Sequence, residues 1–277
     1  MRLKDWQKLE FIQSALREDL GRGDLFSKVV ESKEIEAFIL AKSDGVFAGR
    51  EYIEAFEALF DIELNWSIKD GEEFRSGDIL LEIKGDSQDL LSLERTMLDI
   101  ALHASGIATF TNAYVKKIEP FGVKLLDTRK TRPNLREFEK YAVRCGGAIN
   151  HRMGLDDALM LKDTHLKAID NLEEFISDIR AKIPFTSKIE VECEDLEMVK
   201  RAFEAGADII MCDNMKPKMI KKVVALRNKK YPHILLEASG NITLETIEKV
   251  AKTGIDAISS GSFIHQATWV DLSMKVK

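Results

Sequence analysis

Residues 188–213 read KIEVECEDLEMVKRAFEAGADIIMCD, and this stretch decides the fold. Two short apolar runs, at 188–192 and 208–213, enclose a segment at 195–205 whose apolar residues recur at helical spacing. Short apolar runs that alternate with amphipathic helices are typical of the βα units of a parallel sheet or barrel. The stretch therefore predicts a strand, a helix and a second strand parallel to the first.

The same alternation continues on both sides of this stretch. Strands are predicted at residues 123–127, 158–162, 188–192, 208–213, 233–239 and 256–260. Helices are predicted between them at residues 171–182, 195–205, 217–229 and 244–253, and the last one closes at Gly254. Six or seven strands are fewer than the eight of a full barrel. Residues 106–267 therefore predict an open, reduced α/β barrel.

The first hundred residues follow a different pattern. An amphipathic segment at 6–18 precedes strand-like runs at Glu34–Ala41 and 79–83, and glycines such as Gly77 mark hairpin-like turns. Apolar residues recur at helical spacing over 87–118, where Gly106 is predicted to separate two helices. Residues 1–105 are interpreted as a separate domain of mixed α and β structure.

Composition bounds the class of protein. Of the 277 residues, 45% are hydrophobic and 32% are charged, a balance that predicts a folded globular protein. The net charge of −6 argues against a general nucleic-acid or membrane-surface role, because neither polyanion attracts an acidic molecule. Residues 124–152 differ, since eight Lys or Arg against three Asp or Glu give a local charge of +5. This stretch is predicted to bind anions.

The chain's first residues and its cysteines bear on the cellular compartment. Residues 1–10 are charged and lack the apolar core of a signal peptide, and no apolar run approaches the roughly 20 residues that cross a bilayer. We expect a cytoplasmic protein with no membrane partner. Cys145, Cys193 and Cys212 form no CxxC pair, and we expect them to be reduced, incidental thiols.

Polar residues suited to chemistry end the predicted strands. They are Asp127 (followed by Arg129 and Lys130), Lys162, Glu192, Asp213, Ser239 and Gly261. Because the active site of a parallel α/β barrel lies at the carboxyl ends of its strands, we expect these residues to form one site. The Ser239-Gly240 and Ser260-Gly261 pairs also stand where strand-to-helix turns hold phosphate with backbone N–H groups.

Two groups of opposite charge are predicted to meet at this site. The cationic group consists of Arg129, Lys130, His151, Arg152 and Lys162. Guanidinium and ammonium groups bind carboxylates and phosphates. The anionic group is Glu192 and Asp213, and Mg²⁺ is commonly shared between such carboxylates and a phosphate substrate. We therefore predict a phosphate-bearing, polyanionic substrate together with Mg²⁺.

Simpler interpretations compete at several of these positions. Charges that repeat every four residues fit a solvated helix face, as Arg136, Lys140 and Arg144 do. Glu190 alternates with Glu192 along one strand, and a carboxylate that only forms a structural ion pair also fits this position. Asp213 also fits a helix N-cap, and His151 fits a core histidine with satisfied hydrogen bonds.

Motifs spread over nearly the whole chain resemble one family. The segments LLDTRKTRP at 125–133, EKYAVRCGG at 139–147, NHRMG at 150–154 and LKDTH at 161–165 closely resemble the central signatures of quinolinate phosphoribosyltransferases. EDLGRGD at 18–24 and ISSG at 258–261 extend the resemblance toward both ends. The resemblance implies an N-terminal α/β sandwich, which the tail at about 268–277 rejoins, and an open, reduced α/β barrel.

The resemblance also implies an activity. Members of this family join quinolinate to phosphoribosyl pyrophosphate (PRPP) with Mg²⁺, release carbon dioxide and pyrophosphate, and so serve NAD biosynthesis. They assemble as homodimers or hexamers with shared active sites. Arg95, within Glu94-Arg-Thr96, is implied to reach the site of the neighbouring subunit.

Site residues follow from the same resemblance. The implied quinolinate-binding residues are Arg95, Thr128, Arg129, Lys130, His151, Arg152 and Lys162. The implied PRPP-binding residues are Lys130, Lys162, Glu192, Asp213, Ser239, Gly240, Asn241, Ser260, Gly261 and His265. Of these, Lys130, Lys162, Glu192 and Asp213 are implied to be catalytic, with Glu192 and Asp213 holding Mg²⁺ directly or through water.

Two positions depart from the family pattern. Asn241 stands where a second glycine is common, and Ser260 stands where valine is common. Asparagine tolerates unusual backbone angles and caps helices, so we expect phosphate binding to be kept. Three other functions compete with this one. The first is a related phosphoribosyltransferase, either one of the molybdenum-transport-associated relatives or an enzyme for a monocarboxylate. The second is a Schiff-base lyase that uses Lys162, and the third is a non-catalytic, anion-binding or regulatory barrel.

Overall fold

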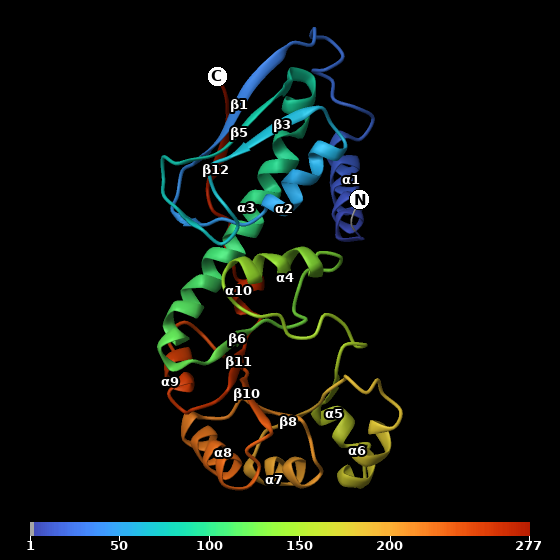
Figure 1. Cartoon of the computed structure of the whole chain (residues 1–277), viewed down its shortest axis with the longest axis vertical. Helices are drawn as coiled ribbons and strands as arrows, with labels where there is room; N and C mark the ends of the chain where they lie inside the picture. Colours follow the sequence, from blue (N-terminus) through green and yellow to red (C-terminus); the bar gives the residue numbers. More distant parts are fainter. Residues whose placement is uncertain (1–2) are drawn as a thin grey trace. The chain divides into compact units, whose positions relative to one another are not determined.

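The computed structural model describes residues 3–277, with side chains from Trp6 onward. The chain forms two compact units (Figure 1). Unit 1 contains the chain up to Phe110, a short piece at Arg144–Gly147, and the end at Ala267–Lys277. Unit 2 contains Thr111–Val143 and Ala148–Gln266. Within residues 3–277, no helix is both long and apolar enough to cross a membrane.

Unit 1 is built on a four-stranded antiparallel sheet in the order β12-β1-β5-β3. The strands are β1 (Glu34–Ala41), β3 (Ile62–Trp66), β5 (Ile79–Asp86) and β12 (Leu272–Val276). Ala37, Ile39 and Ala41 are buried in alternation along β1, as expected for a sheet with one face on the core. The last strand, β12, pairs with β1, so the end of the chain completes this sheet.

Shorter elements surround the sheet of unit 1. They are the helices α1 (Leu3–Leu20), α2 (Arg50–Ile53) and η1 (Glu54–Ala58), and a two-stranded ribbon of β2 (Gly45–Val46) with β4 (Glu73–Phe74). The amphipathic opening at residues 6–18 thus forms a helix, which extends a few residues beyond the predicted segment at each end.

The long helix α3 (Ser87–Ile118) corrects one prediction. It runs for 32 residues without interruption, so the helix break predicted at Gly106 is wrong. A Cβ atom on Gly106 would lie 2.3 Å from the carbonyl oxygen of Thr268 and 3.0 Å from the Cα atom of Trp269. Gly106 allows this close backbone approach, at a helix-interior cost of roughly 0.5–1 kcal/mol relative to alanine.

Unit 2 is built on a six-stranded parallel sheet in the order β6-β11-β10-β9-β8-β7. The strands are β6 (Lys124–Leu126), β7 (Leu159–Leu161), β8 (Ile189–Cys193), β9 (Ile209–Asp213), β10 (Leu235–Ser239) and β11 (Ala257–Ser259). Each strand lies within its predicted segment or extends one residue beyond it. Strands β6 and β7 stand at the two edges, so the sheet stays open and the predicted reduced α/β architecture is confirmed.

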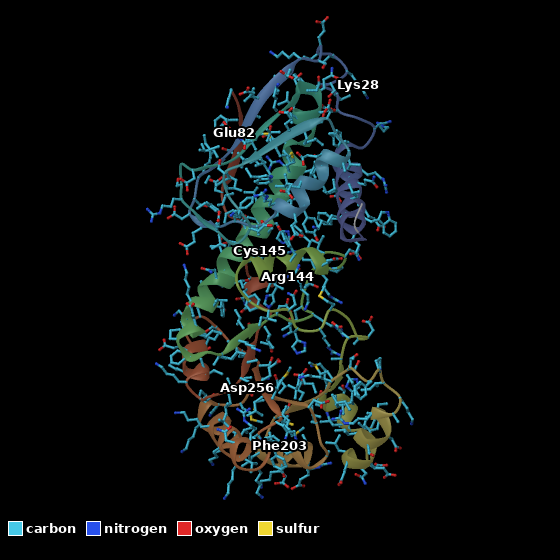
Figure 2. All side chains as sticks on the ribbon, in the orientation of Figure 1. Lys28, Glu82, Arg144, Cys145, Phe203 and Asp256 are labelled. Atoms are coloured by element: carbon cyan, nitrogen blue, oxygen red, sulfur yellow. The ribbon has the colours of Figure 1, made fainter. Side chains whose placement is uncertain are left out.

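Helices connect the strands of unit 2. They are η2 (Glu119–Phe121), α4 (Arg136–Cys145), α5 (Asp163–Leu166), α6 (Leu172–Arg180), α7 (Leu196–Glu204), α8 (Pro217–Lys230), α9 (Ile247–Ala251) and α10 (Ser262–His265). Figure 1 shows α6, α7 and α8 side by side along the outside of the sheet. Phe203 of α7, labelled in Figure 2, stacks on Tyr231 with 4.6 Å between the ring centroids. The carboxyl ends of the strands remain free to form a site.

Helix α9 is shorter than the sequence predicts. The predicted helix covers residues 244–253, whereas α9 covers only Ile247–Ala251. Residues 243–246 instead form a turn in which the backbone N–H of Thr243 donates to Oγ1 of Thr246 at 2.9 Å. A threonine hydroxyl that bonds nearby backbone competes with helix formation in this way.

Candidate active site

A cavity of about 640 Å³ lies in unit 2 at the carboxyl ends of the parallel strands. Its lining contains these predicted site residues: Thr128, Arg129, Lys130, His151, Arg152, Lys162, Glu192, Asp213, Ser239, Gly240 and Asn241. The lining also contains Asp127, Leu155, Met160, His165, Met211, Asn214, Glu237 and Ser259. The structure therefore brings most of the predicted cations and both predicted metal-binding carboxylates into one space.

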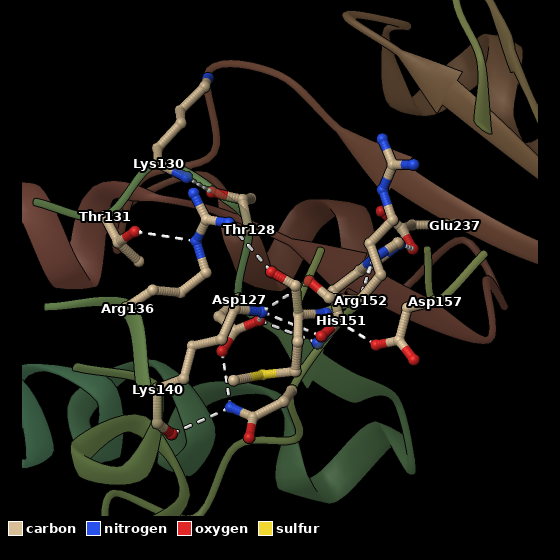
Figure 3. A network of polar contacts seen from close by, with 12 residues as sticks. Asp127, Thr128, Lys130, Thr131, Arg136, Lys140, His151, Arg152, Asp157 and Glu237 are labelled. Atoms are coloured by element: carbon tan, nitrogen blue, oxygen red, sulfur yellow. Dashed lines mark hydrogen bonds and ion pairs between the residues drawn. The ribbon is translucent and has the colours of Figure 1, made fainter. Parts of the chain in front are cut away.

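A buried ion pair fixes the cationic segments of this cavity (Figure 3). Lys140 of α4 donates its three ammonium hydrogen bonds to Oδ1 of Asp127 at 2.5 Å and to the carbonyl oxygens of His151 and Arg152 at 2.9 and 3.1 Å. Asp127 in turn accepts from the backbone N–H of His151 at 2.8 Å and from Nδ2 of Asn150 at 2.6 Å. The network joins the turn after β6 to the segment that carries His151 and Arg152.

The burial of Lys140 corrects the interpretation of α4 as a solvated charged face. Its side chain is 0% exposed, as is the side chain of Asp127. Arg144, one turn along the helix, is exposed, whereas Arg136 is half-buried and donates to the carbonyl oxygen of Met153. The four-residue spacing predicts the helix correctly, but it does not show that the Lys140 side chain is buried.

His151 lies between two buried carboxylates. Its Nε2 atom is 3.1 Å from Oε2 of Glu190 and 3.3 Å from Oε2 of Glu237, whose side chains are almost completely buried. Burial lowers the pKa of His151, but the hydrogen bonds and charges of Glu190 and Glu237 outweigh it and raise the pKa to about 10. His151 is therefore a charged group at the cavity and not a neutral core histidine.

The guanidinium residues Arg129 and Arg152 both line the cavity, as His151 does. Arg152 donates from Nη1 to the carbonyl oxygen of Ala158 at 2.9 Å, and its Nη2 lies 3.5 Å from the sulfur of Met160. Burial, followed by the charge of Arg129, lowers the pKa of Arg152. Like charges held together in this way favour an anion that binds both, because paired carboxylate contacts offset their repulsion.

The carboxylates of Glu192 and Asp213 form an acidic pair at the ends of β8 and β9. Glu192 accepts a hydrogen bond from Nζ of Lys162 at 2.5 Å. Burial, followed by the charge of Glu192, raises the pKa of Asp213. A cation relieves such repulsion, and carboxylate oxygens are the donors that Mg²⁺ prefers. These two residues therefore fit the predicted metal.

The turns predicted to bind phosphate are only partly in the cavity. Ser239, Gly240 and Asn241 line it, whereas the described lining contains neither Ser260, Gly261 nor His265. Gly261 packs against Thr128 and Lys130, because a Cβ atom there would lie 3.0 and 3.1 Å from their side chains. Ser260 is buried and bonds the hydroxyl of Ser262 at 2.7 Å, and His265 is exposed.

Arg95 stands apart from this group, on α3 in unit 1. It pairs with Asp99 at 3.2 Å, and its side chain is 59% exposed. It lines a second cavity of about 540 Å³ within unit 1, together with residues of the EDLGRGD motif such as Asp19 and Asp24. Asp24 holds the turn that follows this motif by accepting hydrogen bonds from Phe26 and Ser27.

Sequence reasoning missed Glu237 and Asn214. Glu237 precedes Ser239 by two residues on β10, and this alternation, which was used for Glu190 and Glu192, would have placed its side chain on the cavity face. Asn214 directly follows Asp213 and has φ 52°, a conformation that asparagine adopts more readily than other residues with side chains. The alternative role of Asp213 as a helix N-cap is wrong, because Lys216 occupies that position of α8.

The fold and the cavity together define a class of protein. Cations and carboxylates from separate strands surround one space at the carboxyl edge of a parallel α/β sheet, as in α/β-barrel enzymes that act on anionic substrates.

Comparison with known proteins narrows this class to one family. The family model for the quinolinate phosphoribosyl transferase C-terminal domain matches residues 107–275, and that for the N-terminal domain matches residues 24–105. The chain belongs to the quinolinate phosphoribosyltransferase family, which confirms the resemblance seen in its motifs.

Individual relatives cover almost the entire chain. A probable nicotinate-nucleotide pyrophosphorylase (carboxylating) of Synechocystis sp. is 38% identical over 269 residues, covering 96% of this chain and 91% of the relative. A protein of the same description from Bacillus subtilis is 40% identical over 262 residues, covering 94% and 90%. The solved structure of NadC from Streptococcus pyogenes superposes with a TM-score of 0.93 at 40% identity, covering 100% of this chain and 99% of that one.

Proposed function

We propose that this protein is a decarboxylating quinolinate phosphoribosyltransferase of NAD biosynthesis. It converts quinolinate and PRPP into nicotinate mononucleotide, pyrophosphate and carbon dioxide. The observation that carries this proposal is the single cavity in which Arg129, Lys130 and Arg152 occur together with Glu192 and Asp213. The similar proteins of Synechocystis and Bacillus subtilis, both described as carboxylating nicotinate-nucleotide pyrophosphorylases, support it.

The cationic side of the cavity suits the two carboxylates of quinolinate. Arg129 and Arg152 lie close enough for the charge of Arg129 to lower the pKa of Arg152, and Glu190 and Glu237 outweigh burial to raise the pKa of His151 to about 10, which favours its charged form. A dianion neutralises the arginines, and the planar guanidinium groups bind carboxylates in fixed orientations. We therefore assign the quinolinate ring to this side, with Thr128 and Lys130 at its edge toward PRPP.

The acidic side suits PRPP and Mg²⁺. Glu192 and Asp213 would hold the ion, directly or through water, and would face the ribose of PRPP. Bound Mg²⁺ supplies Lewis-acid stabilisation of the charge that builds on pyrophosphate. Ser239, Gly240 and Asn241 offer a strand-to-helix turn for the phosphate, and Gly261 would assist from the neighbouring turn with Ser260 and His265 behind it.

The chain need not supply a nucleophile for this reaction. The pyridine nitrogen of quinolinate attacks the anomeric carbon of PRPP, and the bond from that carbon to pyrophosphate breaks. Lys130 and Lys162 balance the departing negative charge, while Glu192 and Asp213 stabilise the positive charge developing on the ribose. The alkylated ring then stabilises the electron pair left on the ring carbon as the adjacent carboxylate leaves as carbon dioxide, and a proton from solvent adds to that carbon, while Arg152 retains the other carboxylate.

The proposal includes assembly and location. Arg95 is exposed on α3 and would complete the quinolinate site of a second copy, so that a homodimer, or a hexamer built from dimers, is the active form. The enzyme would work in the cytoplasm.

The test is an assay of carbon dioxide release and nicotinate mononucleotide formation from quinolinate, PRPP and Mg²⁺. Nicotinate, which lacks the second carboxylate, serves as control substrate and should give little product. Arg152→Ala and Lys162→Ala should each lower kcat/KM by at least a hundredfold, since each removes a charged contact worth about 3 kcal/mol or more in a desolvated site.

Matched control variants are available on α7. Arg201→Ala and Lys200→Ala remove exposed charges that do not line the cavity, and both should retain wild-type activity. Near-normal turnover in both cavity variants would refute the assigned site. Turnover of nicotinate at the same rate as quinolinate would refute the assigned substrate.

A further inference from the structure

Three residues other than glycine adopt left-handed backbone angles in the described part of the chain, and all are asparagines. They are Asn134, Asn214 and Asn241, with φ of 65°, 52° and 51°. Asn214 and Asn241 follow the neighbouring strands β9 and β10, and both line the cavity. The strand register places Asp213 opposite Ser239, so the two turns begin side by side.

The side chains of these two asparagines meet across the turns. Nδ2 of Asn241 donates to Oδ1 of Asn214 at 2.9 Å. Nδ2 of Asn214 donates to Oδ2 of Asp213 at 2.6 Å, and its backbone N–H donates to the carbonyl oxygen of Ser239 at 2.9 Å. One side-chain amide therefore links the carboxylate at the end of β9 with the turn after β10.

Gly240 gives independent evidence that this link is built into the fold. A Cβ atom at Gly240 would lie 2.3 Å from Oδ1 and 2.5 Å from Cγ of Asn214. The backbone at Gly240 also has φ of +90°, which side chains rarely adopt. Glycine at this position therefore leaves the space that the Asn214 amide occupies, in addition to any role in holding phosphate.

We propose that Asn214 is a positioning residue that couples the turn Gly240–Asn241 to the carboxylate of Asp213. This inference rests on the proposed function, in which the turn binds the phosphate of PRPP and Asp213 faces its ribose and Mg²⁺. A phosphate that orders Asn241 also orders Asn214, and Asn214 then fixes the orientation of Asp213. The hydrogen bonds that link Asn241, Asn214 and Asp213 do not involve the arginines, so quinolinate binding should not depend on them.

Asparagine-to-glycine variants test the coupling without straining the backbone, because glycine accepts left-handed angles freely. Asn241→Gly should raise the KM for PRPP about fivefold, and Asn214→Gly about tenfold, since the latter also loses a hydrogen bond to a charged group. The KM for quinolinate should change less than twofold in both. The double variant should be no worse than Asn214→Gly alone, because both substitutions break the same link.

Asn134→Gly is the matched control, since Asn134 has the same backbone conformation and is exposed outside the cavity lining. It should leave both KM values unchanged. Gly240→Ala adds a second test: it should raise the KM for PRPP at least tenfold in the wild-type background and less beside Asn214→Gly, which removes the two side-chain atoms that a Cβ would meet but leaves the backbone nitrogen of residue 214 at 2.9 Å.

Several outcomes would overturn the coupling. Multiplicative losses in the double variant would show that the two asparagines act independently, and an equal rise in the KM for quinolinate would show a general structural role. A wild-type protein that forms no nicotinate mononucleotide refutes the proposed function instead. In that case the wild type, Asn214→Gly, Asn241→Gly and their double variant are compared by calorimetric titration with PRPP and Mg²⁺, where additive losses, or no binding by the wild type, overturn the coupling as well.

Discussion

Replacement of Lys140 by methionine is expected to destabilise unit 2 strongly. Methionine keeps the length and apolar stem of the side chain but removes the ammonium group that reaches Asp127, His151 and Arg152. Asp127 would then be left as a buried charge with no cationic partner among its hydrogen bonds. Removal of one partner of a buried ion pair costs about 3–5 kcal/mol, against a total stability of about 5–15 kcal/mol for a typical domain.

Urea unfolding measures this loss as a change in the free energy of unfolding. Lys221→Met, an exposed lysine on α8, is the control and should change that free energy by less than about 0.5 kcal/mol. Adding Asp127→Asn to Lys140→Met should restore part of the loss, because the remaining buried group is then neutral. A loss below about 1 kcal/mol for Lys140→Met, or no recovery in the double variant, would refute the reasoning.

Two further predictions concern charge and assembly. The pKa of His151 is lowered by burial but raised by Glu190 and Glu237 to about 10, above its ordinary value of 6.5. The contribution of His151 to the stability of the folded protein is therefore complete below pH 6.5 and is lost as the pH rises through about 10. An NMR titration of the ring nitrogens that shows a neutral His151 at pH 8 would contradict this prediction. Arg95→Ala and Lys162→Ala are each expected to be nearly inactive alone. When equal amounts are mixed and exchange subunits, about half of the dimers are mixed, and one of the two sites in each mixed dimer is intact, so activity should return to about a quarter of the wild-type value. Proven subunit exchange without recovery counts against a shared site.

The strands of unit 2 were predictable because each is a short apolar run bounded by a polar residue. Once the strands are parallel, the carboxyl ends of β7, β8 and β9 must meet, and Lys162, Glu192 and Asp213 are brought together without any knowledge of side-chain contacts. Local pattern alone is therefore enough to place the strand-end residues of this site.

Features that depend on contacts distant in sequence were not predictable in this way. Gly106 lies inside a continuous helix, and it is explained by the close approach of residues 268–269, which begin 162 positions later in the chain. The helical spacing of Lys140 was visible, but its burial depends on Asp127 and on the loop at 151–152. The link that Asn214 makes could not be predicted, because it depends on hydrogen bonds from its side-chain amide to Asp213 and from Asn241 to that amide.

The pairing of β12 with β1 has a consequence for synthesis of the protein on the ribosome. Strand β1 ends at Ala41, whereas its partner β12 begins at Leu272, so β1 is synthesised long before the strand that pairs with it. Until β12 has been synthesised, one edge of β1 presents unpaired N–H and C=O groups, the kind of edge that recruits other chains. The sheet of unit 1 can therefore be completed only after Leu272–Val276 have been made, and a variant that lacks β12 would leave that edge of β1 open to aggregation.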